Sequence, residues 1–331
     1  MKMFPLAALV AALGVSAAAA QEPIVLKLAT GSPSSSSTWK ELIVPWAERV
    51  EAASEGTIKF EYYADGQLSK MGDTYNRVAA GVADVGWDLP PLYGKQFLLM
   101  SVTGLPGLYS DTEIASPAFF RGIVNGKISK EMDDFKVIFT SASVNGSFFL
   151  KEPLKSNTNL EGWKIAVNSK QRAEAVQGMG GTPVSISPPE QYQALSKGVL
   201  DGALSSMGAV SAYKLFELTH YYLVGPFGGS SSAMLMNKAK YESLPPKAKK
   251  AIDDNSTPEQ SRIVGEWFKN FEETAMGKIA AMPGNQRVVI SEEDLKAWQP
   301  VFDKIVDSWI EETPGGKETI AAFRAEMKAG M

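Results

Sequence analysis

The chain has 331 residues, with 33 lysines and arginines, 37 aspartates and glutamates, one histidine and no cysteine. This composition is typical of a globular protein, and a net charge of −4 gives no basic surface for nucleic acid. The absence of cysteine excludes disulfides and cysteine-bound metal clusters, and the single histidine, His220, excludes histidine-rich metal sites. Composition therefore favours binding over catalysis.

The first twenty residues have the pattern of an export signal. Lys2 precedes a nearly continuous apolar stretch from Phe4 to Ala20, which ends in small residues of the kind that signal peptidases prefer. We therefore expect residues 1–20 to be a cleaved signal peptide, with a short transmembrane anchor as the alternative. Because no cysteine is present for lipid attachment, the mature protein is predicted to be free in a bacterial periplasm.

The next segment predicts a strand, a helix and a second strand. Residues 24–30 form a β-rich run, apolar positions recur at helical spacing from Thr38, and residues 57–62 alternate between apolar and polar. Pro45 is expected to kink the helix, and Gly56 to end it. This order implies a parallel strand pair with a right-handed crossover.

A sequence echo indicates two related units. Residues 78–87 and 194–203 each end a helix on a glycine, turn at an aspartate and begin a strand. We interpret the echo as one βα unit in each of two lobes, with chance similarity as the alternative. Strands are also predicted at 162–167 and 233–236, and capping motifs at Thr257 and Ser291 are expected to open two long helices.

Catalytic motifs are missing from the sequence. It has no phosphate-binding loop, no dinucleotide-binding glycine motif after the first strand and no Gly-x-Ser-x-Gly elbow. A periplasmic hydrolase, the least favoured class, would depend on His220 or on a pair of cleft carboxylates. Several aromatic residues fall near predicted strand ends, where the ligand cleft of an α/β protein lies.

In a set of colinear motifs, the chain resembles the DctP-like periplasmic solute-binding proteins of TRAP transporters. The motifs span 65–68, 80–84, 105–108, 160–165, 191–195 with 198–202, 237–238 and 243–246. The resemblance implies an α/β, two-lobed periplasmic binding protein fold, class II-like, with crossing strands and a long connecting helix. It places lobe I at 21–145 plus 229–272 and lobe II at 146–228 plus 273–331.

The same resemblance implies a function. The lobes close on a small organic solute, and the closed form delivers it to TRAP membrane permease subunits, which are driven by ions and not by ATP. We expect a monomer that is not an enzyme and needs no cofactor and no metal. Presentation of the ligand to a sensor is the alternative partner.

The chain departs from the family pattern at the ligand. Ala166 and Asn145 stand where the family usually has arginines that bind a carboxylate, and Ser205 stands where it has an asparagine. Leu204 and Ser205 leave no glutamate for a metal. The ligand is therefore expected not to be a simple dicarboxylate but a small neutral, aromatic or amine-bearing solute.

The family's positions give a set of predicted ligand contacts. They are Trp87, Tyr93, Asn145, Phe148, Asn168, Ser205, Met207 and Phe227. Two alternatives stay open: Asp88 pairs with a ligand ammonium group, or Lys170 and Arg172, which follow the lost arginine, hold a carboxylate.

Overall fold

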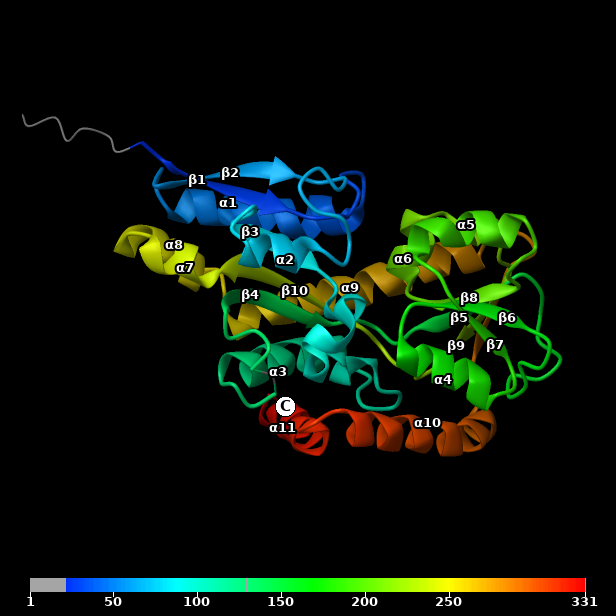
Figure 1. Ribbon diagram of the computed structural model, residues 1–331. Coiled ribbons are helices and arrows are strands. Elements are labelled where there is room, and N and C mark those ends of the chain that lie inside the picture. Colours follow the sequence, from blue (N-terminus) through cyan, green and yellow to red (C-terminus); the bar gives the residue numbers. More distant parts are fainter. Residues whose placement is uncertain (1–21, 129, 331) are drawn as a thin grey trace, which may run out of the picture.

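The computed structural model describes residues 22–128 and 130–330, so the predicted signal peptide lies outside the described residues. The protein has two α/β lobes, each built on one sheet (Figure 1). The first sheet has the order β2-β1-β3-β10-β4, with β1 (Ile24–Ala29), β2 (Ile58–Tyr63), β3 (Val85–Asp88), β4 (Phe135–Ala142) and β10 (Ser231–Asn237). The second has the order β11-β9-β5-β8-β6-β7, with β5 (Ser147–Leu150), β6 (Lys164–Val167), β7 (Thr182–Ser185), β8 (Gly202–Ser205), β9 (Tyr221–Val224) and β11 (Gln286–Val289). The predicted two-lobed α/β fold is confirmed.

Helices cover both sheets and join them. The first lobe carries α1 (Val44–Ala53), α2 (Thr74–Ala79), α3 (Thr112–Val124), α7 (Lys238–Ser243), α8 (Pro246–Asp254) and 3₁₀ turns at Pro90–Phe97 and Leu99–Gly104. The second lobe carries α4 (Lys170–Gly178), α5 (Pro188–Ser196), α6 (Met207–Ala212) and a 3₁₀ turn at Leu215–Glu217. The long helices α9 (Pro258–Ala280) and α10 (Glu292–Glu312) and the terminal α11 (Gly316–Ala329) complete the chain. In the part of the chain that the structure describes, no helix combines the length and apolarity needed to cross a bilayer.

The first predicted unit forms as expected. β1 and β2 pair in parallel, with Ile24 opposite Ile58. Pro45 lies in the first turn of α1, and a wider π-helical turn, Thr38–Ile43, precedes it. Because proline has no N–H to donate, the hydrogen-bond pattern changes here, from π-helical before it to α-helical from Val44 on.

The sequence echo is a structural repeat. Gly81 and Gly198 end their helices with φ of 70° and 69°. The carboxylates of Asp84 and Asp201 then accept hydrogen bonds from the amides of Lys27 and Lys164, each at 2.8 Å. Equivalent residues thus make equivalent contacts in the two lobes.

Two chain segments cross between the lobes. Residues 143–146 join β4 to β5, and residues 225–230 join β9 to β10. The two segments bond to each other: the Ser143 amide donates to the Ser230 carbonyl at 2.8 Å, and the Gly146 amide to the Gly228 carbonyl at 2.9 Å. The predicted crossing strands therefore form a two-stranded connection at the base of the cleft.

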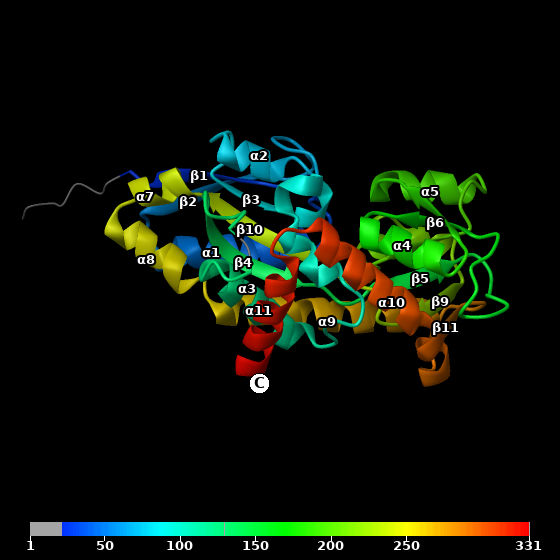
Figure 2. The ribbon, with the colours of Figure 1, turned by 60° about the horizontal axis from the view of Figure 1, so that its bottom comes forward.

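Two long C-terminal helices, α9 and α10, also connect the lobes. Thr257 and Ser291 accept hydrogen bonds from Gln260 and Asp294, so both long helices begin at the predicted caps. α10 leads back from the second lobe to the first, where α11 lies beside α3 (Figures 1 and 2). The predicted assignment of 273–331 to lobe II therefore needs correction at its end: Glu326 of α11 pairs with Arg121 of α3 at 2.9 Å.

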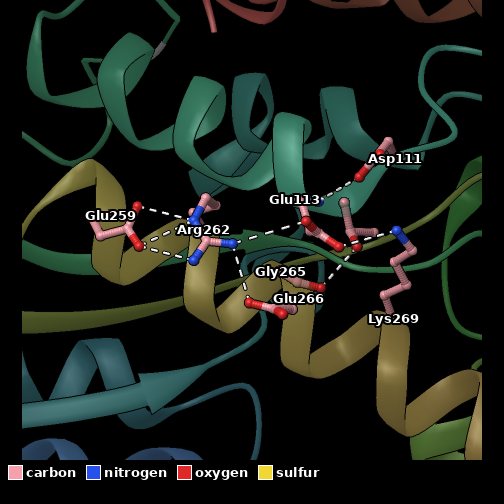
Figure 3. A network of polar contacts seen from close by, with 8 residues as sticks. Asp111, Glu113, Glu259, Arg262, Gly265, Glu266 and Lys269 are labelled. Carbon is pink, nitrogen blue, oxygen red and sulfur yellow. Dashed lines mark hydrogen bonds and ion pairs between the residues drawn. The ribbon is translucent and has the colours of Figure 1, made fainter. Parts of the chain in front are cut away.

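Helices α3 and α9 pack closely and carry a charged network between them (Figure 3). Arg262 of α9 pairs with Glu259 at 2.9 Å and Glu266 at 3.1 Å on its own helix, and Lys269 pairs with Glu113 of α3 at 3.0 Å. Because these side chains are partly exposed, the network contributes little per pair. It joins α3 to the first-lobe half of the helix that spans the molecule.

Candidate functional site

A narrow pocket lies between the lobes. Its first-lobe wall consists of Leu89, Pro91, Leu92, Ser101, Gly104, Gly229 and Ser230, and its second-lobe wall of Asn168, Ser169, Gln171 and Arg172. The free volume is about 10 Å³, which is room for roughly one water molecule. A small organic solute therefore enters this site only when the lobes separate.

Arg172 is the charged residue of this pocket. It lies in the first turn of α4, whose N-cap Ser169 accepts a hydrogen bond from the Arg172 amide, and the side chain is 2% exposed. Nη1 donates to Asn168 Oδ1 at 3.0 Å, and Nη2 approaches the carbonyl oxygens of Gly228 and Gly229 at 3.5 and 3.4 Å. These acceptors are neutral oxygens on second-lobe and crossing segments.

The Arg172 guanidinium has no carboxylate partner among the described residues, and its Nε donates to no described atom. Burial lowers the pKa of Arg172 to about 10, so the group still carries its charge at neutral pH. A buried cation that contacts only neutral oxygens is costly, and an anion beside it removes that cost. The geometry therefore suits a ligand carboxylate.

Three further predicted contacts lie at or beside strand ends: Asn145, Trp87 and Ser205. Asn145 is on the first crossing segment, where Nδ2 donates to the Tyr109 carbonyl at 3.1 Å and Oδ1 is buried without a described partner. Trp87, at the end of β3, has a buried indole N–H that likewise lacks one. Ser205 ends β8 and is 3% exposed. Buried polar groups are nearly always hydrogen-bonded, so the first two are expected to find partners in a ligand or in water.

Asp88 and Tyr93 have structural roles in the first lobe. The Asp88 carboxylate accepts hydrogen bonds from the amides of Gly72 at 2.8 Å, Thr74 at 3.2 Å and Leu89 at 2.8 Å, and from the Tyr93 hydroxyl at 2.6 Å. Burial still raises its pKa, because these bonds offset only part of the lost hydration. Both side chains use their polar atoms within the lobe and neither lines the pocket, so their ligand roles stay predictions.

Three predicted contacts belong to the hydrophobic core. Phe148 and Phe227 are 0% and 1% exposed and pack edge to face, 4.9 Å apart, with Trp298 of α10 beside them. Met207 is fully buried among α6 and α9 residues of the second lobe. The contact of Phe148 with Phe227 and Trp298 joins distant segments, which position in the sequence alone does not reveal. None of the three lines the pocket, and their role as ligand contacts stays a prediction.

Lys170 and Arg172 have opposite environments although one residue separates them. Lys170 is exposed and pairs with Glu312 of α10 and, at 3.5 Å, with Glu174. Because helix positions two apart face different directions, only Arg172 turns into the pocket. Of the two cations in the carboxylate alternative, one remains a candidate.

Glu272 interacts with the charge of Arg172 from outside the pocket lining, and the sequence analysis did not single it out. Its Oε2 accepts a hydrogen bond from the Met207 amide at 3.1 Å, immediately after β8. Burial raises the pKa of Glu272 to about 8, although the Met207 amide and the charges of Arg172 and Arg287 lower it. A signal was present, because Glu272 stands on the apolar face of α9, four residues after Phe268 and four before Met276.

His220 is not part of this site. It is exposed at the start of β9, and its Nδ1 lies 2.8 Å from Asn285 Oδ1. Within residues 22–128 and 130–330, no group of three or more acidic or histidine side chains is arranged to hold a metal ion.

The chain matches a family model over most of its length. Residues 29–313 match the model of the DctP family, described as bacterial extracellular solute-binding protein, family 7. The C4-dicarboxylate-binding periplasmic protein DctP of Rhodobacter capsulatus is 24% identical over 95% of this chain and 94% of its own.

Solved structures show the same relationship. A TRAP solute-binding protein from a marine metagenome, specific for aromatic acids and crystallised with 3-hydroxybenzoate, is 27% identical, with a TM-score of 0.86 over 93% of this chain and 99% of its own. A TRAP solute-binding protein of Rhodoferax ferrireducens with copurified benzoate is 25% identical, with a TM-score of 0.85 over 93% of this chain and 98% of its own. Proteins of this family are solute receptors that bind small organic molecules and work with a TRAP permease. The protein described here is therefore a member of the DctP family and a TRAP-type solute-binding protein.

Proposed function

We propose that this protein is exported to the periplasm and captures a small organic monocarboxylate, with an aromatic acid as the preferred class. The carboxylate binds at Arg172, and the closed protein, as a monomer, delivers the ligand to its TRAP permease. The single observation that carries the proposal is the buried Arg172 guanidinium, which faces an interlobe pocket without a carboxylate partner among the described residues.

The number of charges in the pocket supports one carboxylate instead of two. Arg172 is the charged residue among the pocket-lining side chains, and Ala166 is fully buried where the family usually has an arginine. A dicarboxylate would bury a second negative charge without a partner, which is costly. The relatives at 27% and 25% identity bind 3-hydroxybenzoate and benzoate, each with one carboxylate.

This choice replaces the neutral or amine-bearing ligand expected from the sequence. That expectation rested on the two lost arginine positions, and it gave Lys170 and Arg172 only as the alternative. The ammonium version loses its support because the Asp88 carboxylate is occupied by four donors.

The test compares Arg172→Met with Lys170→Met. Each variant removes one positive charge at nearly the same place in the chain, but only Arg172 faces the pocket. We expect benzoate and its monohydroxy derivatives to raise the melting temperature of the wild-type protein and of Lys170→Met. Arg172→Met is expected to weaken their binding at least a hundredfold, since it removes a buried charge-assisted pair.

Calorimetric titration gives the affinities, and circular dichroism shows whether each variant is folded. Equal affinities of Arg172→Met and the wild-type protein for these acids would contradict the proposal. Binding of succinate more tightly than any of the monocarboxylates would contradict it too.

A further inference from the structure

Arg172 and Glu272 reach the same end of β8 from the two faces of the second sheet. α4, which carries Arg172, packs on the face that contains Leu204, and α9, which carries Glu272, packs on the face that contains Ala203. Nη1 of Arg172 lies 3.4 Å from the Leu204 carbonyl, and Oε2 of Glu272 accepts from the Met207 amide at 3.1 Å. The two side chains thus approach each other where the strand ends.

The Arg172 charge is not neutralised by this neighbour. The hydrogen-bond acceptors of Arg172 among the described residues are all neutral oxygens. Burial raises the pKa of Glu272 to about 8, and the charge of Arg172 only partly opposes that rise. Tyr109 also faces Arg172, and because burial raises the pKa of its hydroxyl, it stays uncharged. At neutral pH the guanidinium therefore lies beside a carboxyl group that still holds its proton.

Few other charges surround Glu272. Neither β8 nor α6 carries a charged side chain. From β11, the exposed Arg287 adds a positive charge that lowers the pKa of Glu272. On α9 itself, Lys269 pairs with Glu113 and Glu273 is exposed. A negative charge placed at the buried guanidinium would therefore act directly on the proton of this carboxyl group.

From this arrangement we infer that the protein binds its acid ligand together with a proton on Glu272, so that its affinity for an organic anion is full at neutral pH and falls in alkaline solution. The inference rests on the proposed function, because Arg172 is where the ligand carboxylate binds. An anion at Arg172 and an ionised Glu272 would share one positive charge, which disfavours the second negative charge. By linkage, the bound ligand holds the proton on Glu272 more firmly.

The pH at which free Glu272 loses its proton sets the range of the effect. Below about pH 8 the carboxyl group is protonated with or without ligand, and the affinity is independent of pH. Above it, the unliganded protein loses the proton while the complex keeps it. The dissociation constant then rises by up to about tenfold per pH unit, which is the limit for one proton.

Calorimetric titration of benzoate at pH 6, 7, 8 and 9 measures this dependence, because benzoate itself is ionised throughout the range. For the wild-type protein we expect a dissociation constant about three- to tenfold higher at pH 9 than at pH 7. In Glu272→Gln, which has no proton to lose, this ratio is expected to be near one. Glu273→Gln removes the adjacent, exposed carboxylate and is expected to keep the wild-type ratio.

Proton uptake tests the same linkage without a variant, and so it decides the matter even if Glu272→Gln does not fold. Titrations in two buffers with different enthalpies of ionisation give the number of protons taken up with each benzoate. We expect uptake of up to about half a proton at pH 8 and almost none at pH 6. Release of protons, or no exchange, at pH 8 would overturn the inference. A Glu272→Gln variant with the wild-type ratio would overturn it as well.

The Arg172→Met variant separates this inference from the proposed function. If it binds benzoate at pH 7 as the wild-type protein does, or if the wild-type protein does not bind benzoate, the carboxylate site is wrong and the inference falls with it. If Arg172→Met loses benzoate while the wild-type affinity is the same at pH 7 and pH 9, the carboxylate site stands and the proton linkage alone is refuted.

Discussion

At the scale of single residues, an arginine and a glutamate lie near the same end of the second sheet without forming an ion pair. Arg172 reaches the end of β8 through the Leu204 carbonyl at 3.4 Å, and Glu272 takes the Met207 amide just beyond it. With a pKa of about 8, Glu272 is largely protonated at neutral pH. It therefore leaves the Arg172 charge available for a ligand.

The raised pKa of Glu272 predicts how stability depends on pH. The folded protein holds this proton up to about pH 8, whereas the unfolded chain releases it near the ordinary value of 4.5. The stabilisation that protonated Glu272 gives is therefore complete below pH 4.5 and is lost as the pH rises to about 8. Glu272→Gln removes this dependence, and its oxygen still accepts from Met207.

Urea unfolding at several pH values measures this effect. We expect the free energy of unfolding of Glu272→Gln to rise relative to the wild-type protein between pH 4.5 and 8. Glu273→Gln changes the adjacent, exposed carboxylate and is expected to follow the wild-type curve. If the free energy of unfolding depends on pH in the same way in the wild-type protein and in Glu272→Gln, then Glu272 ionises with its ordinary pKa in the folded state, and the explanation is refuted.

At the scale of elements, one glycine sets the approach of α9 to α3. A Cβ added to Gly265 would lie 2.2 Å from the Thr112 carbonyl oxygen, and the Thr112 hydroxyl donates to the Gly265 carbonyl at 2.8 Å. The charged network of Figure 3 lies beside this contact. Close backbone packing therefore positions α9, and the ion pairs add to it on the partly exposed side.

The same substitution at two positions of α9 tests this packing. Gly265→Ala is expected to lower the free energy of unfolding by about 1–3 kcal/mol, because the added methyl overlaps backbone that moves little. Gly277→Ala has no atom within 4 Å of the new Cβ, and it is expected to raise the free energy of unfolding by about 0.5–1 kcal/mol through helix propensity. Urea unfolding measures both, and two changes of the same sign would refute the explanation.

At the scale of the whole molecule, the pocket is closed by contacts that join the lobes. Ser101 of the first lobe accepts from Trp309 of α10 at 2.8 Å and lies 3.4 Å from Gln171 of α4, the residue before Arg172. Since the free volume is about 10 Å³, capture of a solute requires these contacts to open and re-form. The crossing segments 143–146 and 225–230 are the natural place for that bending.

Distance measurements between the lobes test this motion. The chain has no native cysteine, so Val82→Cys and Val199→Cys place one label on each lobe, at the equivalent exposed positions of the repeat. We expect the distance distribution between the labels to shift when a binding acid is added, because ligand favours the closed state. The same ligand is expected to leave the labelled Arg172→Met variant unshifted. Identical distributions with and without ligand in the otherwise wild-type labelled protein would refute the opening and closing of the lobes.

The sequence by itself determined the units of this fold. The helix ends at Gly81 and Gly198 and the caps at Thr257 and Ser291 lie where the sequence places them. These features depend on backbone preferences and contacts within a few residues, which the order of side chains along the chain specifies. The colinear motifs indicated the family. Because Ala166 and Asn145 stand where the family usually has arginines, a simple dicarboxylate was not the expected ligand.

Only the tertiary structure decided which of the candidate residues line the interlobe pocket. Phe148, Met207 and Phe227 point into the core, Lys170 turns to Glu312, and Arg172 turns into the pocket. The direction of each side chain depends on which sheet face and which neighbouring lobe cover it. Glu272 and Arg172 are 100 positions apart in the sequence, and only packing brings them to the same end of a sheet. Burial that results from contacts between distant segments leaves no pattern among neighbouring residues. For that reason the full set of pocket residues could not be predicted from the sequence.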